Sequence, residues 1–376
     1  MTMAGAEFYI GLMSGTSLDG VDAVLLRVGA DGRVQAPAHE YQPFGAELRA
    51  ELLALNSPGD NELQRAALAG NAVARAYAQV CRALLNAQRR VPQDIRALGA
   101  HGQTVRHRPG EFDGTGFTLQ VLNASLLAEL TGIAVVHDLR SRDLAVGGQG
   151  APLVPAFHRA ALAQPGEDVA VLNVGGISNV SLLWADGRSG GFDCGPGNCL
   201  MDGWIHQHQG ASYDAGGQWA AQGQVHAGLL AALLAEPYFH QAPPRSTGRD
   251  LFHLGWLDER ITAHAPQVSA VDVQATLLEL SARGVTDSLA AHAPGAWREL
   301  LVCGGGAFNE ALLGRLRALL PGMTVATTDR RGLPPMQVEG AAFAWLAMRH
   351  VRGLPGNLPA ATGGTGLRVL GSYTPA

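Results

Sequence analysis

Residues 9–28 read YIGLMSGTSLDGVDAVLLRV, two apolar runs joined by a turn of small and polar residues. A β-hairpin reverses the chain with only about two to five residues. The turn here, residues 14–22, is longer and carries three hydroxyl groups and two carboxylates. Since reversing the chain needs none of these groups, the loop is a candidate ligand site.

This loop suits an anion together with a metal ion. Its glycines let backbone N–H groups approach phosphate oxygens closely, and Thr16 and Ser17 add hydroxyl donors. Asp19 and Asp22 suit Mg²⁺, which is usually held by one or two carboxylates and keeps several waters. An ordinary hairpin with a solvated polar turn is the alternative interpretation.

Two further glycine-rich turns follow later in the chain. Residues 169–184 read VAVLNVGGISNVSLLW and repeat the order of apolar run, small polar turn and apolar run. Residues 303–306 read CGGG and precede Asn309. The repeated arrangement indicates a duplicated domain. Together the three turns favour a nucleotide held between two related lobes, although each alone also fits a hairpin or tight strand–helix packing. The candidate nucleotide contacts in the later turns are Gly175, Gly176, Gly304, Gly305 and Gly306.

A candidate general base lies in residues 190–198, which read GGFDCGPGN. Asp193 ends a short apolar stretch and is followed by the rigid turn residues Gly195, Pro196 and Gly197. A carboxylate held at a strand end is well placed to accept a proton. The alternative is an aspartate that only satisfies turn N–H groups.

Composition predicts a folded protein and excludes several classes. The chain has 376 residues, 47% of them hydrophobic and 16% charged, which favours a packed core over disorder. The net charge of −5 argues against a nucleic-acid partner. The longest apolar stretch, residues 227–235, is about half the ~20 residues of a membrane span, and no signal-peptide pattern begins the chain.

All 27 basic residues are arginine. A P-loop, a protein kinase and a Schiff-base enzyme each need a lysine, so the sequence excludes these three classes. The four cysteines follow no zinc-site pattern and predict a reduced, cytoplasmic protein.

The hydrophobic pattern alternates between strands and helices. Strands are expected at residues 8–13, 23–28 and 95–100, and helices at 62–87 and 271–291. This alternation predicts an α/β fold.

Two polar segments offer further ligand contacts. His101 follows an expected strand in AHGQTVRH, and Arg140 and Arg142 lie in HDLRSRD, residues 137–143. Forked arginine donors suit a carboxylate or phosphate. A solvated salt-bridge loop is the alternative for the second segment.

Taken together, these motifs resemble the anhydro-N-acetylmuramic acid kinases of bacterial cell-wall recycling. The resemblance covers nearly the whole chain and is carried by GLMSGTSLDGVD, HGQTV, DLAVGGQGAPLVPAFH, LNVGGISN, GGFDCGPGN, STGRD, DVQATL, CGGGAFN, GAAFAWLA and GLPGNLPAATG. It implies the actin-like, ribonuclease H-like ATPase fold, with two duplicated α/β lobes and a nucleotide cleft between them. We expect lobes at residues 1–146 and 147–376, with the final residues packing back on the first lobe.

The resemblance also implies roles for individual residues. Asp193 would be the catalytic base, with Cys194 beside it where relatives often carry threonine. His137 stands where glycine is common. Asp19 and Asp22 are the expected Mg²⁺ ligands, and His101 and Arg142 the expected cations for the lactyl carboxylate of the sugar. The implied ATP phosphate loop consists of Gly15, Thr16, Ser17, Leu18, Asp19, Gly20, Val21 and Asp22.

The implied activity is ATP-dependent hydrolytic opening of 1,6-anhydro-N-acetylmuramic acid with phosphorylation to N-acetylmuramic acid 6-phosphate. The expected partners are this amino sugar and ATP with Mg²⁺, and whether the chain forms a homodimer is left open. Two alternatives remain: an ordinary hexose or acid kinase of the same fold, and a chaperone-like or filament-forming ATPase.

Overall fold

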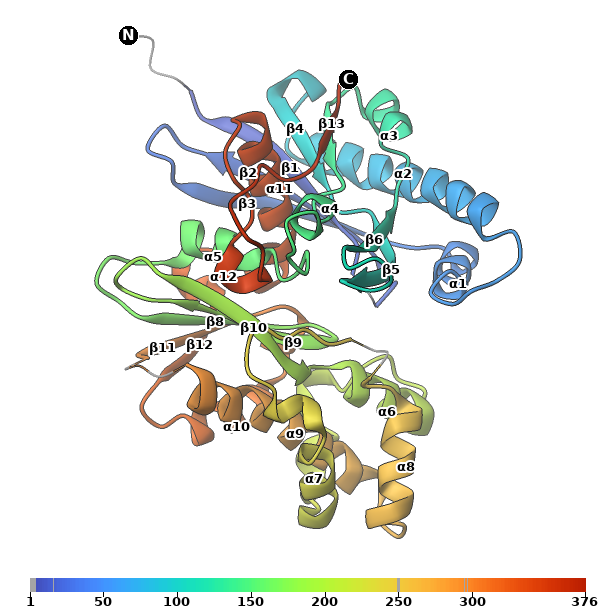
Figure 1. Ribbon diagram of the computed structural model, residues 1–376, viewed down its shortest axis with the longest axis vertical. Helices are drawn as coiled ribbons and strands as arrows, with labels where there is room; N and C mark the ends of the chain where they lie inside the picture. The colour runs from blue at the N-terminus through green and yellow to red at the C-terminus, as the bar shows by residue number, and fades with distance from the viewer. Residues whose placement is uncertain (1–4, 16, 249–250, 294, 296) are drawn as a thin grey trace. The chain divides into compact units, whose positions relative to one another are not determined.

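The computed structural model describes residues 5–15, 17–248, 251–293, 295 and 297–376 (Figure 1). Contacts divide the chain into two compact units. The first contains the described residues up to Ala161 together with Gln337–Ala376, and the second is Leu162–Met336.

In the first unit, the main sheet has the strand order β13-β7-β4-β1-β2-β3. β1, β2 and β3 form an antiparallel meander, whereas β1, β4 and β7 run parallel. The short β13 adds to the edge, antiparallel to β7. The strands of this sheet are β1 (Glu7–Met13), β2 (Gly20–Val28), β3 (Val34–Pro43), β4 (Ile95–Ala100), β7 (Val135–His137) and β13 (Ser372–Thr374).

The sheet of the second unit has the order β10-β9-β8-β11-β12. Again the first three strands in sequence form an antiparallel meander, and the first, fourth and fifth run parallel. Apart from the edge strand β13, both sheets therefore share one topology. This finding confirms the predicted α/β fold with duplicated units. The strands are β8 (Val169–Val174), β9 (Ile177–Leu183), β10 (Ser189–Pro196), β11 (Glu299–Cys303) and β12 (Thr324–Thr327).

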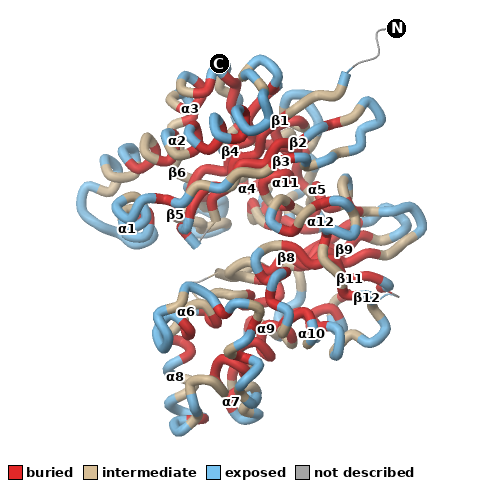
Figure 2. Tube along the Cα trace, turned by 180° about the vertical axis from the view of Figure 1, so that it is seen from behind, coloured by how far each residue is buried: buried red, intermediate tan, exposed pale blue. Residues whose placement is uncertain are grey.

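Helices pack on the sheets, and the central strands are buried (Figure 2). The first unit also contains a hairpin of β5 (Gln103–Pro109) and β6 (Gly116–Val121). Helices of the first unit are α1 (Ala46–Ala54), α2 (Glu62–Ala87), α3 (Ala124–Thr131), α4 (Ser141–Leu144), α11 (Val338–Val351) and α12 (Pro359–Thr362), and α5 (Val154–Leu162) ends at the division. Helices of the second unit are α6 (Cys199–Gln209), α7 (Ala227–Leu234), α8 (Leu254–His264), α9 (Ala270–His292) and α10 (Glu310–Leu319).

The predicted elements are confirmed with small changes at their ends. The helix expected at residues 62–87 is α2 without change, and the one expected at 271–291 is α9, longer by one residue at each end. The strand expected at 23–28 starts earlier, at Gly20.

The contact division differs in position from the expected lobe boundary between residues 146 and 147. Residues 147–161 and 337–376 pack with the first unit. The assignment of the two units to functional lobes stays a prediction.

Glycines let α11 lie directly against the sheet of the first unit. A Cβ atom on Gly11 of β1 would lie 1.8 Å from the carbonyl oxygen of Gly340 and 2.6 Å from the nitrogen of Ala344. A Cβ on Gly99 of β4 would lie 2.0 Å from the carbonyl oxygen of Phe343. These contacts are to backbone atoms, which cannot rotate away, so any larger residue would push α11 off the sheet.

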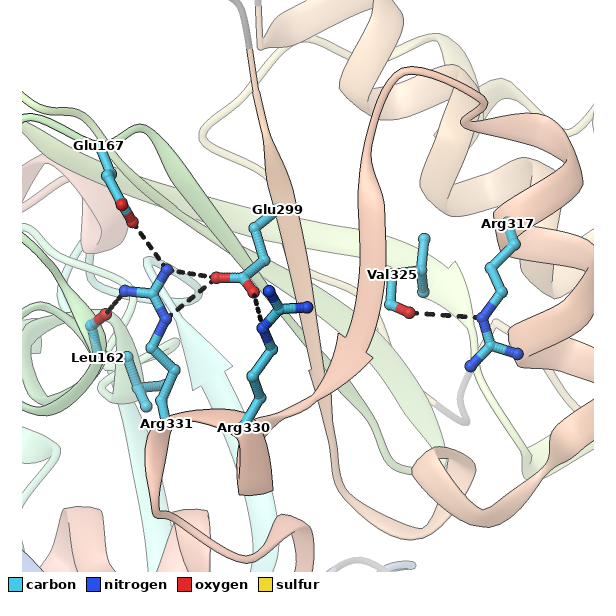
Figure 3. Close-up of polar contacts among 7 residues, drawn as sticks. All are labelled: Leu162, Glu167, Glu299, Arg317, Val325, Arg330 and Arg331. Atoms are coloured by element: carbon cyan, nitrogen blue, oxygen red, sulfur yellow. Dashed lines mark hydrogen bonds and ion pairs between the residues drawn. The ribbon is translucent and has the colours of Figure 1, made fainter.

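A charge network centred on the buried side chains of Arg331 and Glu299 lies at the edge of the second unit (Figure 3). The side chains of Arg331 and Glu299 are 10% and 9% exposed and form an ion pair. Arg331 also donates to the carbonyl oxygen of Leu162 at 3.2 Å and to Glu167 at 2.9 Å, and Arg330 pairs with Glu299 at 3.2 Å. The network therefore joins the start of β11 to the turn after β12 and to the segment that leads into β8.

Among the described residues, no helix has both the length and the apolar character that crossing a membrane requires.

We predict that Gly11→Ala destabilises the protein, because the added methyl group overlaps the backbone of α11. Overpacking of this kind costs typically about 1–3 kcal/mol. The matched control is Gly314→Ala in α10, where an added Cβ meets nothing within 4 Å. The control should hold or raise the thermal unfolding midpoint, since alanine is the better helix former. Equal midpoints for Gly11→Ala and wild type would contradict the tight α11 contact.

Candidate active site

Asp193 lies near the end of β10, at a bulge in its pairing with β9. Asp193 is paired with Asn179, and the register then shifts so that Gly195 pairs with Ser178. Gly195 has φ +126, a value that L side chains rarely adopt. The bulge interrupts the regular pairing at Asp193, which is partly exposed, and β10 then continues to Pro196.

The hydrogen bonds of Asp193 come mainly from the loop that follows η4 (Pro237–His240). The backbone N–H of Thr247 donates to carboxylate Oδ2 at 3.0 Å. The hydroxyl of Tyr238 and Nε of Arg245 donate to the main-chain oxygen of Asp193, at 2.8 and 3.0 Å. The backbone is therefore fixed from two sides, while the carboxylate keeps oxygen Oδ1 without a partner among the described residues.

Arg245 supplies positive charge near Asp193, but it directs its donors elsewhere. Its side chain is buried, and its described hydrogen bonds go to Ser288 and to main-chain oxygens, among them those of Asp193 and Gln241. Because these donors bond to main-chain oxygens and to Ser288, Arg245 stabilises the loop and forms no ion pair with the Asp193 carboxylate among the described contacts.

Burial raises the pKa of Asp193 to about 7, although the N–H of Thr247 and the charge of Arg245 act in the opposite direction. A carboxylate with this pKa is a far better proton acceptor than an ordinary aspartate, and an effective catalytic base has a pKa near the working pH. This environment suits a general base.

Cys194 does not share this environment. Its side chain is buried in the hydrophobic core of the second unit, and burial raises the pKa of its thiol to about 12. The thiol at this position therefore stays protonated and acts as a core residue.

In the second unit, the structure brings the two predicted glycine turns together. Backbone N–H groups of Gly197 and Asn198 donate to the oxygens of Gly176 and Gly175, at 2.9 and 2.8 Å. A Cβ on Gly304 would lie 2.4 Å from Oδ1 of Asn173. The turn after β8, the end of β10 and the turn after β11 thus meet at one edge of the sheet. Ligands of open α/β sheets bind at such carboxyl ends of strands.

In the first unit, the loop between β1 and β2 is held by residues 101–103. The backbone N–H of His101 donates to the oxygen of Leu12 at 3.0 Å, and Ser14 Oγ donates to the oxygen of Gly102 at 3.2 Å. Nε2 of Gln103 donates to the oxygen of Gly15 at 3.0 Å. The HGQ segment therefore fixes the start of the candidate phosphate loop.

Residues of this loop differ in what they can offer a ligand. Leu18 and Val21 are buried in the core, so only their backbone can contact a phosphate. Ser17 and Asp19 are exposed, and Ser17 Oγ donates to Asp19 Oδ1 at 2.6 Å. Thr16 lies outside the described residues, as do two residues of the STGRD motif, 249 and 250.

Asp19 and Asp22 fit a magnesium ion by their chemistry. Both supply hard carboxylate oxygens, although Asp22 Oδ1 already pairs with Nε2 of His39 at 2.6 Å. Within the described part of the chain, no group of three or more histidine, cysteine, aspartate or glutamate side chains forms a metal cage. Mg²⁺ needs no such cage, since one or two carboxylates plus phosphates and waters suffice.

His101 is buried and held in its neutral form. Its Nδ1 lies 3.2 Å from the oxygen of Ser14, a pure acceptor, and its Nε2 accepts from Arg140 Nε at 3.1 Å and Nη2 at 2.9 Å. Burial and the neighbouring charge of Arg140 hold the pKa of His101 well below its usual range. This finding argues against His101 as a cation for a carboxylate. Arg142, in contrast, is exposed.

Sequence reasoning assigned no individual role to several residues that complete these two regions. Most of them lie in motifs quoted above, but spacing alone did not show which partners they meet. They are His39, Gln103, Asn173, Asn179, Asn198, Arg245 and Thr247, and Arg140, noted only as an alternative anion contact, belongs with them.

Comparison with known proteins gives a consistent result. The family model described as "Anhydro-N-acetylmuramic acid kinase" matches residues 7–376. The chain belongs to the anhydro-N-acetylmuramic acid kinase family. A relative of that name from Variovorax paradoxus is 59% identical over the full length of both chains. Another from Pseudomonas paraeruginosa is 53% identical, covering 98% of this chain and 99% of its own.

Among solved structures, the chain is similar to the activator of 2-hydroxyisocaproyl-CoA dehydratase from Clostridium difficile with bound ADPNP. That similarity has a TM-score of 0.49 and 11% identity, and covers 92% of this chain and 96% of the other.

We predict that the Asp193 carboxyl group titrates with a midpoint of about 7, because burial penalises its charged form. Carbon NMR of protein labelled at the aspartate carboxyl carbons measures this directly. The Asp193→Asn variant identifies the signal by its loss. A midpoint near 4, as for an exposed aspartate, would contradict the described environment.

Proposed function

We propose that the chain is an ATP-dependent kinase that opens 1,6-anhydro-N-acetylmuramic acid with water and yields N-acetylmuramic acid 6-phosphate, in cell-wall recycling in the cytoplasm. The observation that carries the proposal is the raised pKa of Asp193 at the strand end where the glycine turns meet. Membership of the kinase family supports the substrate and the phosphoryl donor.

The chemistry needs one base rather than the usual pair of carboxyl groups. Hydrolysis of a glycosidic bond normally uses a carboxylic acid to protonate the leaving oxygen and a carboxylate to activate water. In this reaction the leaving oxygen, O6, takes the γ-phosphoryl group of ATP, so no separate acid is required. Asp193 accepts a proton from the water that attacks the anomeric carbon, and ADP leaves.

Residues 15–22 and the glycine turns would bind the phosphates of ATP through backbone N–H groups. Asp19 and Asp22 would hold Mg²⁺, which neutralises charge on the transferring phosphoryl group when bound. Phosphoryl transfer depends mainly on such positioning and electrostatic stabilisation. An added Cβ on Gly175 or Gly305 would meet its nearest neighbours only at 3.6 and 3.7 Å, so these two glycines leave room for close approach of a nucleotide. Gly304 and Gly306 instead pack tightly against Asn173 and Val174.

Arg142 is the proposed contact for the lactyl carboxylate, because it is exposed while His101 is held neutral. Arginine suits a carboxylate because its planar fork donates two parallel hydrogen bonds.

The test is a short incubation of the protein with the anhydro sugar, ATP and Mg²⁺ in ¹⁸O-labelled water. We expect a 6-phosphate whose anomeric oxygen carries the label, since water supplies that oxygen. Product made in ordinary water and then held in labelled water for the same time measures background exchange. Asp193→Asn should reduce the rate at least about 100-fold, the lower range for loss of a general base.

An ordinary sugar kinase would give a different result. Its product would keep the anhydro bridge, be lighter by one water and carry no label. That result, or more than about a tenth of the wild-type rate in Asp193→Asn, would contradict the proposal.

A further inference from the structure

A row of polar side chains crosses three strands of the second unit beside Asp193. In the antiparallel ladders, Asn179 of β9 pairs with Asp193 on one side and with Asn173 of β8 on the other. Directly paired residues present their side chains on the same face, with Cβ atoms about 4.5–5.5 Å apart. The next pair along the strands, Val180 and Phe192, lies in the hydrophobic core. Asn179 and Asp193 therefore share the opposite face.

The side-chain oxygen of Asn179 is a buried acceptor that has no hydrogen-bond partner among the described residues. A buried polar atom without a partner costs about 1–3 kcal/mol, and the great majority of such atoms are satisfied by protein or ordered water. Such an exception next to a candidate base needs an explanation. A bound water or substrate group that donates a hydrogen bond supplies one.

The carboxylate of Asp193 also has one acceptor oxygen without a hydrogen-bond partner among the described residues. Oδ2 accepts from the N–H of Thr247 at 3.0 Å, whereas Oδ1 has no partner among the described residues. The site thus pairs two acceptor oxygens, one charged and one neutral, on neighbouring strands. A water molecule has two O–H donors, and each acceptor can receive one of them.

We propose that Asn179 is a second catalytic residue, whose side-chain oxygen holds the attacking water together with Asp193. When both protons of the water point to these acceptors, a lone pair of its oxygen is directed at the anomeric carbon. The proposal rests on the proposed function, because it assigns a role in the hydrolytic step.

The step balances in atoms and charge. The water oxygen forms a bond to the anomeric carbon while the bond from that carbon to O6 breaks. One water proton passes to Asp193, and the other remains on the new hydroxyl group, hydrogen-bonded to Asn179. The electron pair released on O6 forms the bond to the γ-phosphoryl group, and ADP leaves.

The first test is Asn179→Ala, assayed with the anhydro sugar, ATP and Mg²⁺. We expect kcat to fall about 10- to 100-fold, as for a reactant that loses its orientation. Affinity for a non-hydrolysable ATP analogue should stay within about twofold, because the water is not held by the nucleotide. The matched control is Asn123→Ala, since this asparagine caps α3 in the other unit and lies outside the site. It should keep wild-type kcat despite a stability cost of about 1 kcal/mol.

The second test is Asn179→Asp, which keeps an acceptor but places a second carboxylate opposite Asp193. Like charges at this distance disfavour ionisation. The acidic limb of kcat/KM should therefore move to higher pH, and activity above that limb should exceed that of Asn179→Ala. The shift of the acidic limb tests whether residue 179 lies close to Asp193, and the recovered activity separates a water-holding role from a purely structural one. Arg245, whose Nε donates to the main-chain oxygen of Asp193 from the adjoining loop, is unchanged in both variants.

Three outcomes would overturn the proposal: kcat of Asn179→Ala within about threefold of wild type, an equal loss of nucleotide affinity, or an unmoved acidic limb in Asn179→Asp. Failure of the proposed function gives a separate result, since wild type would then form no product labelled at the anomeric oxygen. If wild type incorporates the label and Asn179→Ala keeps its rate, only the role of Asn179 is lost.

Discussion

The candidate site depends on one constraint, the partial removal of the Asp193 carboxylate from water. Burial raises the pKa of this group to about 7, and the structure does not relieve the effect with a direct ion pair. Arg245 is close enough to supply charge, yet its described donors are committed to backbone oxygens and Ser288. The same residue that braces the loop therefore leaves the carboxylate able to accept a proton. The bulge after Asp193 completes the arrangement by interrupting the regular pairing of β10 with β9 at that point.

Duplication explains where the remaining candidate groups lie. Both sheets place an antiparallel meander beside parallel strands, so each unit has a turn after its first strand and another after its fourth. In the first unit these turns are the loop of residues 14–19 and the HGQ segment that holds it. In the second they are the turns at Gly175 and Gly304. One topology thus provides both a polar loop suited to phosphates and magnesium and a glycine-lined edge with a base.

Local pattern predicted much of this structure from sequence. The boundaries of α2, the two hairpins and the position of Asp193 follow from periodicity and turn residues. The partners of Asp193 could not be predicted, because Arg245 and Thr247 are 52 and 54 residues away in sequence. The neutral state of His101, which argues against a role as a cation, could not be predicted for a related reason, because it depends on burial and on Arg140, 39 residues away. Asn179 was visible in the sequence, but only strand register places it opposite Asp193.

The most direct test needs no substrate and measures how burial of the Asp193 carboxyl group changes the stability of the protein with pH. A raised pKa means that the folded state favours protonated Asp193, so stability is greatest below the unfolded pKa and declines as the pH rises through about 7. In the Asp193→Asn variant the side chain cannot ionise, so its stability does not decline for this reason. Thermal unfolding of both proteins from pH 4 to 9 should show the variant gaining stability relative to wild type until about pH 8 and then staying level. A difference that is constant over this range would contradict a raised pKa for Asp193.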